Sequence, residues 1–178
     1  MRIAFFELGK IHYNFGFLNE AIKTWIRSHD FSTSEEDLLN VSFTIAQAAF
    51  ENMATPYLSK FAGEADARDK GKNVSKTVQV KILDALSSIS VENYRDAAIK
   101  LTSMPLSYVQ AISELVRPQD LAFYVVICSL KSLNRSDIKQ TILQASGFKT
   151  LMELSGSSGN LEDVIENFLN GRYMEFQR

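Results

Sequence analysis

Apolar residues recur along this chain every three or four positions, which is the period of an α-helix. Between residues 75 and 89 they form one stripe, as expected for a helix with a single buried face: Val78, Ile82, Ala85, Leu86 and Ile89. Between residues 33 and 53 two such stripes run side by side, beginning at Leu38 and Leu39. A helix with two apolar faces needs neighbours on both sides, so the pattern predicts helices stacked in a row.

The first thirty residues carry the most specific pattern, FFELGKIHYNFGFLNEAIKTWIRS. It resembles a tetratricopeptide repeat, with a bulky residue, then Leu-Gly, then Ala and an aromatic residue at set distances. Small residues are expected where the two helices of a hairpin cross, and large ones where space on either side must be filled. The residues assigned to this hairpin packing are Phe5, Leu8, Gly9, Ala21 and Trp25. The resemblance implies an all-α fold, a right-handed superhelical stack of tetratricopeptide-like helix hairpins (an α-α superhelix).

The rest of the chain extends this organisation. A second, degenerate hairpin is predicted over residues 75–104, from ILDALSSISVENYRDAAIKL, and further helices over 118–178. With the first hairpin over 1–30, these segments are expected to form one helical-repeat domain, 1–178. The apolar pattern is cut off at both ends of the sequence without capping residues, so we expect a piece of a longer chain.

Charge and composition argue against some classes of function. The 19 basic and 21 acidic residues give a net charge of -2, without the positive field that nucleic-acid binding usually requires. The longest apolar run, Leu121 to Cys128, is far shorter than the roughly 20 residues that span a bilayer. We expect neither nucleic acid nor membrane as a partner. A single cysteine suits a reducing compartment, the nucleus or cytosol.

No group of residues matches a known catalytic or cofactor site. His12 and His29 fall on different helices without a metal-ligand spacing, and we expect His12 to pack in the hairpin and His29 to be solvated. Cys128 lies in the most apolar helix, where a thiol fills the core and its pKa rises. No phosphate-binding glycine motif is present. The chain is therefore predicted to be no enzyme, with no metal and no cofactor.

Some charged residues remain as candidates for contact with a partner. Arg27 and Asp30 could pair across the end of the first hairpin, which we favour, or face a partner, and Arg135 and Lys139 could contact an acidic partner. Four further cations alternate with acidic residues, so that their field largely cancels and a solvated loop between helices is favoured over a docking site: Arg68, Lys70, Lys72 and Lys76.

Five segments in one order resemble a known family. They are IRSHDFSTSEE, NYRDAAIKL, RPQDLAFYVVICSLKSLNRSDIKQ, SGFKTLMEL and NFLNGRY. The family comprises subunit 1 of the COP-nine signalosome and its paralogue, the seventh non-ATPase subunit of the proteasome lid. Asp30 and Phe31 after Arg27, and Pro118 to Asp120 leading into the helix with Cys128, look more like the signalosome member.

The resemblance implies a helical-repeat arm leading toward a proteasome-signalosome-initiation-factor (PCI) domain, whose winged helix this sequence lacks. It implies a non-catalytic scaffold subunit of a complex that removes a ubiquitin-like modifier from cullins and so regulates ubiquitin ligases. A different, metalloprotease subunit of that complex performs the cleavage. The implied partners are other signalosome subunits and cullin-RING ligase components, and the implied location is nucleus and cytoplasm.

Two alternatives stay open. The first is a proteasome lid subunit of the same family. The second is a free tetratricopeptide module that captures a partner's tail in its groove. Only Lys10, Asn14 and Lys23 in the first hairpin are of the residue types that such grooves use, so this alternative ranks below the scaffold.

Overall fold

The structure is a computed structural model that describes residues 1–71, 73–104, 112–144, 146–155 and 158–176. All regular secondary structure in these ranges is helical, which confirms the predicted all-α fold. The chain divides into two compact units, Met1–Val91 and Glu92–Arg178. Among the described residues, no helix has both the length and the apolar character needed to cross a membrane.

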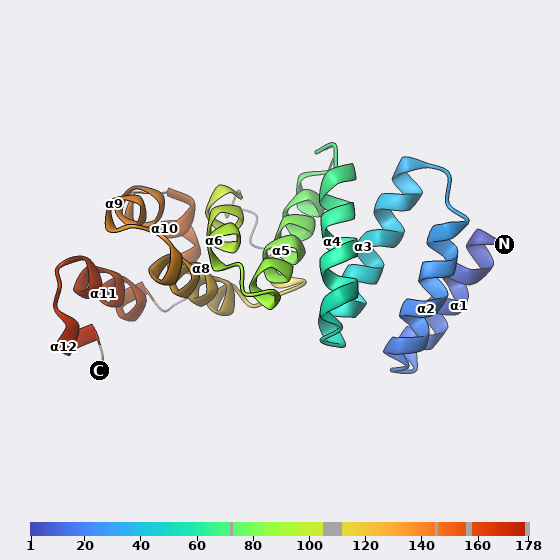
Figure 1. The fold of residues 1–178 in the computed structure, drawn as a ribbon, viewed down its shortest axis with the longest axis horizontal. Coiled ribbons are helices and arrows are strands. Elements are labelled where there is room, and N and C mark those ends of the chain that lie inside the picture. Colours follow the sequence, from blue (N-terminus) through green and yellow to red (C-terminus); the bar gives the residue numbers. More distant parts are fainter. Residues whose placement is uncertain (72, 105–111, 145, 156–157, 177–178) are drawn as a thin grey trace. The chain divides into compact units, whose positions relative to one another are not determined.

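The first unit contains five helices that lie next to one another in chain order (Figure 1). They are α1 (Arg2–Asn14), α2 (Leu18–Asp30), α3 (Glu35–Glu51), α4 (Thr55–Arg68) and α5 (Val74–Ser90). Each helix packs against the next, and the contacts are most extensive within the pairs α1/α2 and α3/α4. These two pairs are the helix hairpins of the predicted stack, and α5 covers the second pair.

Helix α3 shows why the sequence forms a row. Its two apolar stripes bury residues on different sides, Val41 and Ile45 on one and Ala46 on the other. The helix accordingly contacts α2, α4 and α5. A helix of this kind removes both of its apolar faces from water only when it has neighbours on both sides. Burial of apolar surface therefore drives the stacking.

The turn between α1 and α2 depends on Gly16, which has a φ of +79°. In this left-handed conformation its N–H donates to Tyr13 O at 2.9 Å, and the Phe17 N–H donates to His12 O at 2.9 Å. Both bonds use carbonyls that the end of α1 leaves without a helical partner. The chain can therefore reverse direction within three residues of the end of α1.

The second unit is built around α8 (Pro118–Ser132), which packs against α6, α10 and α11. The other helices with described bounds in this unit are α6 (Tyr94–Ser103), α9 (Arg135–Ile138), a π-helical segment η1 (Lys139–Leu143), α10 (Ser146–Ser155), α11 (Ser158–Leu169) and α12 (Tyr173–Phe176). The segment predicted as a second hairpin, 75–104, forms α5 and α6, but these helices belong to different units.

Candidate protein-binding groove

The two helices of the first hairpin cross at Gly9. Gly9 and Ala21 are buried, and Trp25 is only 2% exposed. The indole Nε1 of Trp25 donates to Phe6 O at 3.0 Å, so the ring lies directly on the backbone of α1. Because a side chain at residue 9 would occupy the space of the indole, the close approach of the helices requires glycine.

The other two residues assigned to this packing lie at its edge. Phe5 is half-buried and stacks on Phe31, with ring centroids 5.7 Å apart. Leu8 leaves 43% of its surface exposed, so the assignment of Leu8 to the hairpin core needs correction. Successive residues of a helix point about 100° apart, and the neighbour of the buried Gly9 therefore faces outward.

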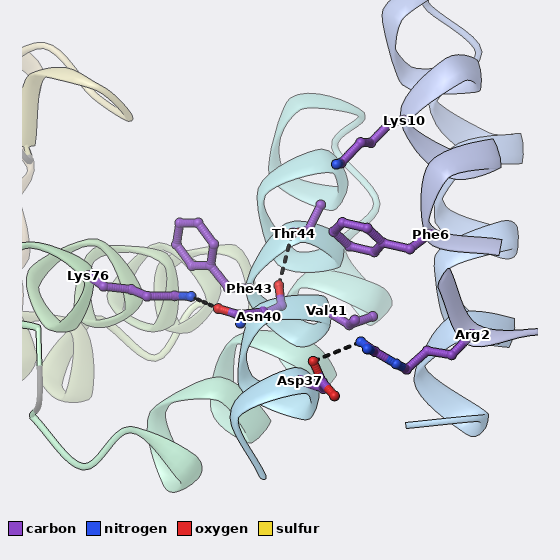
Figure 2. A pocket seen from close by; sticks show the side chains of 9 residues that line it. All are labelled: Arg2, Phe6, Lys10, Asp37, Asn40, Val41, Phe43, Thr44 and Lys76. Atoms are coloured by element: carbon purple, nitrogen blue, oxygen red, sulfur yellow. Dashed lines mark hydrogen bonds and ion pairs between the residues drawn. The ribbon is translucent and has the colours of Figure 1, made fainter. Parts of the chain in front are cut away.

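Helices α1, α3 and α5 together line a pocket of about 430 Å³ (Figure 2). Its lining residues are Arg2, Phe6, Lys10, Asp37, Asn40, Val41, Phe43, Thr44 and Lys76. A second pocket of about 290 Å³ shares Asn40 and Lys76 with the first and extends to the segment between α4 and α5. We call the two pockets together the α1/α3/α5 groove.

Ion pairs and aromatic contacts hold the α1 side of the groove. Arg2 Nη1 lies 2.7 Å from Asp37 Oδ1, which joins α1 to α3. Lys10 pairs with Glu7 at 2.8 Å, and its ammonium lies 4.8 Å from the centroid of the Phe6 ring. The cations on this side are therefore already matched by carboxylates of the same unit.

Lys76 differs from these cations. Its ammonium donates to Asn40 Oδ1 and lies 5.5 Å from the centroid of the Phe43 ring (Figure 2). Burial lowers the pKa of Lys76, and the more distant charges of Glu36 and Asp69 oppose this shift. The prediction that Lys76 belongs to a solvated loop is wrong, because it lies in the first turn of α5 and is half-buried.

Of the other cations predicted with Lys76, Arg68 pairs with Glu64 at 2.8 Å and Lys70 is exposed. Lys72 lies outside the described residues. Of the three groove candidates in the first hairpin, Lys10 lines the pocket, whereas Asn14 is exposed on α1 and Lys23 pairs with Glu20 on α2 at 2.8 Å.

His29 is a residue that sequence reasoning misplaced. Its side chain is 16% exposed and not solvated, and its ring meets the edge of Phe61 at a centroid distance of 5.5 Å. His29 Nε2 lies 3.4 Å from Glu64 Oε1, the same oxygen that Arg68 contacts. This cluster ties α2 to α4. His12, the other histidine, is half-buried as expected.

Polar bonds also connect the two hairpins near their turns, and no sequence pattern predicts them. The hydroxyl of Tyr13 donates to Glu51 Oε1 at 2.7 Å, and Asn52 Nδ2 donates to Asn19 Oδ1 at 2.7 Å. Burial, together with the bond to Glu51 and its charge, raises the pKa of Tyr13 to about 12. The bond from Tyr13 to Glu51 joins α1 to α3, two of the helices that line the groove, and the bond from Asn52 to Asn19 joins the end of α3 to α2.

The remaining candidates for partner contact are all on helices. Arg27 and Asp30 are both exposed in the last turn of α2, and the structure, which describes both side chains, records no ion pair between them. Arg135 donates to the Tyr173 hydroxyl, and its guanidinium lies 5.5 Å from the Phe168 ring centroid. Lys139 is exposed.

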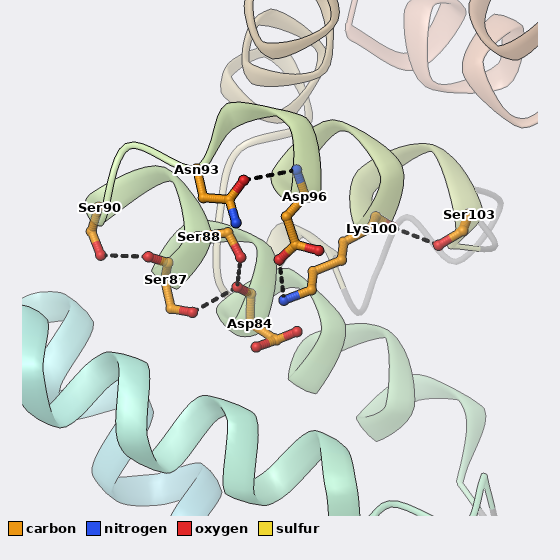
Figure 3. A network of polar contacts seen from close by, with 8 residues as sticks. All are labelled: Asp84, Ser87, Ser88, Ser90, Asn93, Asp96, Lys100 and Ser103. Carbon is orange, nitrogen blue, oxygen red and sulfur yellow. Dashed lines mark hydrogen bonds and ion pairs between the residues drawn. The ribbon is translucent and has the colours of Figure 1, made fainter. Parts of the chain in front are cut away.

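Polar residues at the end of α5 and the start of α6 make contacts that serve the helices (Figure 3). In the first unit, the hydroxyls of Ser87 and Ser88 donate to Asp84 O at 2.7 and 3.2 Å. In the second, Asn93 Oδ1 accepts the Asp96 N–H at 3.3 Å and caps α6. These contacts lie within α5 and at the start of α6.

No three potential metal ligands gather anywhere in the part of the chain that the structure describes. Cys128 is 2% exposed, and burial raises the pKa of its thiol. A thiol in this environment resists deprotonation and behaves as a core residue. Among the described residues, the α1/α3/α5 groove is the candidate site for contact with another protein.

Comparisons with known proteins give consistent results. The profile of the family described as 26S proteasome subunit RPN7 matches residues 1–141. COP9 signalosome complex subunit 1 of Arabidopsis thaliana is 22% identical over 173 residues, covering 97% of this chain and 38% of the relative. Its counterpart in Emericella nidulans is 26% identical, covering 94% of this chain and 33% of the relative.

A third relative, COP9 signalosome complex subunit 1b of Drosophila melanogaster, is 24% identical, with 94% of this chain and 32% of the relative covered. The predicted resemblance to subunit 1 of the signalosome is thereby confirmed. This chain spans about a third of the length of these relatives.

Proposed function

This chain belongs to the family of the 26S proteasome subunit RPN7, and from that premise we propose that it is a non-catalytic scaffold subunit of a COP9 signalosome. The observation that carries the proposal is the similarity to three proteins named as signalosome subunit 1, which extends over 94% to 97% of the chain. The other signalosome subunits are then its partners.

The surface of the first unit supports a role in holding other proteins. Large apolar side chains are exposed on α1 and at the hairpin turns, among them Ile3 (66%), Phe15 (74%), Phe17 (61%) and Met53 (90%). Burial of these side chains by another protein would remove apolar surface from water and so favour binding. A row of helices also presents an extended face, which suits simultaneous contact with more than one neighbour.

The finer proposal concerns the activity of the assembly. We propose that the complex removes a ubiquitin-like modifier from cullins, that another subunit cleaves the bond, and that this chain positions its neighbours, including cullin-RING ligase components. Nucleus and cytoplasm are the proposed locations. Neither nucleic acid nor membrane is a partner in this proposal, in keeping with the net charge of -2.

The second candidate is a subunit of the proteasome lid. It is favoured by the family match itself, because the family is described by the proteasome subunit RPN7. The two candidates share a fold and a scaffold role, and they differ in the proteins that surround the chain.

Native purification separates the two candidates. The gene is tagged at its chromosomal locus, the protein is isolated at moderate salt, and co-purifying subunits are identified and quantified by mass spectrometry. The proposal predicts signalosome subunits in amounts close to that of this chain. An equivalent set of proteasome lid subunits would establish the second candidate, and recovery of the chain without either set would contradict both.

A further inference from the structure

The α1/α3/α5 groove contains a half-buried cation, Lys76, on which Glu36 and Asp69 act only through their more distant charges. Among the described residues, no carboxylate lies within ion-pair distance of the Lys76 ammonium, whose hydrogen-bond acceptor is the neutral Asn40 amide. An ammonium has three N–H donors, and the bond to Asn40 uses one. Partly buried charges are normally paired, because the loss of hydration must be offset. Lys76 is therefore suited to a carboxylate that approaches from outside.

The orientation of Asn40 adds a second donor at the same place. Its Oδ1 accepts from Lys76, so the amide NH₂ group is on the other branch of the side chain (Figure 2). Within the described part of the chain, no group accepts from this NH₂. An ammonium and an amide NH₂ side by side can donate to the two oxygens of one carboxylate.

The surroundings distinguish a single carboxylate from a polyanion. Glu36 and Asp69 border the second pocket, and Asp37 borders the first. Asp37 is paired with Arg2, and in the second pocket Glu36 and Asp69 stand among the cations Arg68 and Lys70. The groove therefore lacks the continuous positive field that the closely spaced phosphates of a nucleic acid require. Phe43 and Val41 offer apolar contact instead. The groove thus complements a segment with one negative charge and neutral side chains around it.

The position of Lys76 also decides which kind of carboxylate fits. Lys76 and Asn40 line both pockets, so the groove continues to either side of the two donors. A partner peptide whose C-terminal carboxylate bound Lys76 would fill one pocket and leave the other empty. A segment that passes through, with a side-chain carboxylate at its centre, fills both.

We propose that the α1/α3/α5 groove binds an extended segment of a partner protein, with one internal glutamate or aspartate held by Lys76 and Asn40 and with uncharged residues on either side. The carboxylate replaces water at the ammonium and takes the amide donor that Asn40 leaves open. The flanking apolar side chains pack on Phe43 and Val41. This inference does not rest on which complex contains the chain.

The probe is an array of nonapeptides, acetylated and amidated at their ends, with glutamate at the centre and uncharged residues elsewhere. The strongest binder is then titrated in solution by fluorescence polarisation against this 178-residue chain. The same peptide with glutamine at the centre should bind at least about tenfold more weakly, because it loses a charge-assisted hydrogen bond. This comparison leaves the protein unchanged, so it stands whatever the variants do to folding.

Protein variants locate the site. Lys76→Met and Asn40→Ala should each weaken binding of the glutamate peptide, the former at least about tenfold. Lys23→Met is the matched control, since Lys23 pairs with Glu20 on α2 and should leave binding unchanged. Circular dichroism of each variant confirms that the helices are intact.

Several results would overturn the proposal. Equal binding of the glutamine peptide would show that no carboxylate is recognised, and unchanged binding by folded Lys76→Met would show that the site is elsewhere. Tighter binding of a neutral peptide with a free C-terminus would show that the groove recognises a C-terminal carboxylate and not an internal one. Displacement of the peptide by a single-stranded RNA would assign the groove to nucleic acid. None of these results alters which subunits co-purify with the chain.

Discussion

Replacement of Gly9 by alanine probes the packing on which the first hairpin depends. A Cβ atom at residue 9 would lie 2.5 Å from Trp25 Cδ1 and 2.8 Å from Cε2, and closer still to Nε1. Carbon atoms in contact are normally about 3.5–4.0 Å apart. Trp25 is 2% exposed, so its ring has no free space into which it can move without displacing other core residues.

Three effects set the magnitude. Overpacking of a filled core costs about 1–3 kcal/mol. A shift of the indole breaks the bond from Nε1 to Phe6 O, and a buried donor without a partner costs about 1–3 kcal/mol. Alanine is favoured over glycine within a helix by about 1 kcal/mol, which opposes the other two. The central values leave Gly9→Ala less stable by about 3 kcal/mol.

Urea denaturation measures this loss. Trp25 is the one tryptophan of the chain and lies in the first hairpin, so its fluorescence reports unfolding of that hairpin. Far-UV circular dichroism serves as the second probe, and a change in midpoint at constant slope is a change in stability. Gly63→Ala is the matched control, because that helical glycine is exposed and its nearest atom, Asp84 Oδ1, is 4.0 Å away.

The two substitutions should have opposite signs. Gly63→Ala gains helix propensity without a clash and is expected to stabilise the chain by up to about 1 kcal/mol. If Gly9→Ala raised the urea midpoint as Gly63→Ala does, residue 9 could not lie at the crossing of α1 and α2.

Three further predictions concern single groups. Because the pKa of Tyr13 is raised from 10.0 to about 12, the stabilisation from its protonated hydroxyl is complete below pH 10 and is lost between pH 10 and pH 12. The difference between the ultraviolet absorbance titrations of the chain and of Tyr13→Phe should show one tyrosine that ionises near pH 12, and the stability of Tyr13→Phe should depend less on pH over that range; ionisation of Tyr13 near pH 10 would contradict its burial and its bond to Glu51. The buried Cys128 thiol should react with Ellman's reagent only after unfolding, and rapid reaction of the native chain would contradict its burial. Asn93→Ala removes the cap of α6 and should cost about 1 kcal/mol in thermal unfolding, whereas an unchanged midpoint would show that the bond to the Asp96 N–H contributes nothing.

The crossing of α1 and α2 could be predicted from residue size. A glycine and an alanine at set distances from a tryptophan leave few ways to pack two helices, and Gly9 does lie against Trp25. The same reasoning does not place Leu8 correctly, because its side chain is exposed. Helix α1 is apolar on more than one side, and composition alone does not say which side its partner covers.

The division of the chain could not be predicted for a similar reason. Residues 75–104 have the pattern of two helices that could pair, but a pattern describes the faces of each helix and not the helix that covers it. In the structure, α4 packs against α5, and α8 packs against α6. The boundary consequently falls between Val91 and Glu92, inside the predicted hairpin.

The groove was the least predictable feature. Asn40 and Lys76 are 36 residues apart and lie on different helices, and each resembles an ordinary polar residue of a solvated face. They meet because α3 packs against α5, which is a property of the folded unit. The position of His29 against Glu64 likewise depends on how α2 and α4 approach each other.

Native mass spectrometry of the assembly isolated through this chain tests most directly whether the chain acts by holding other proteins. We expect one copy of the chain in a complex whose mass and dissociation products correspond to signalosome subunits. A chain that is recovered alone, or only with further copies of itself, would contradict it.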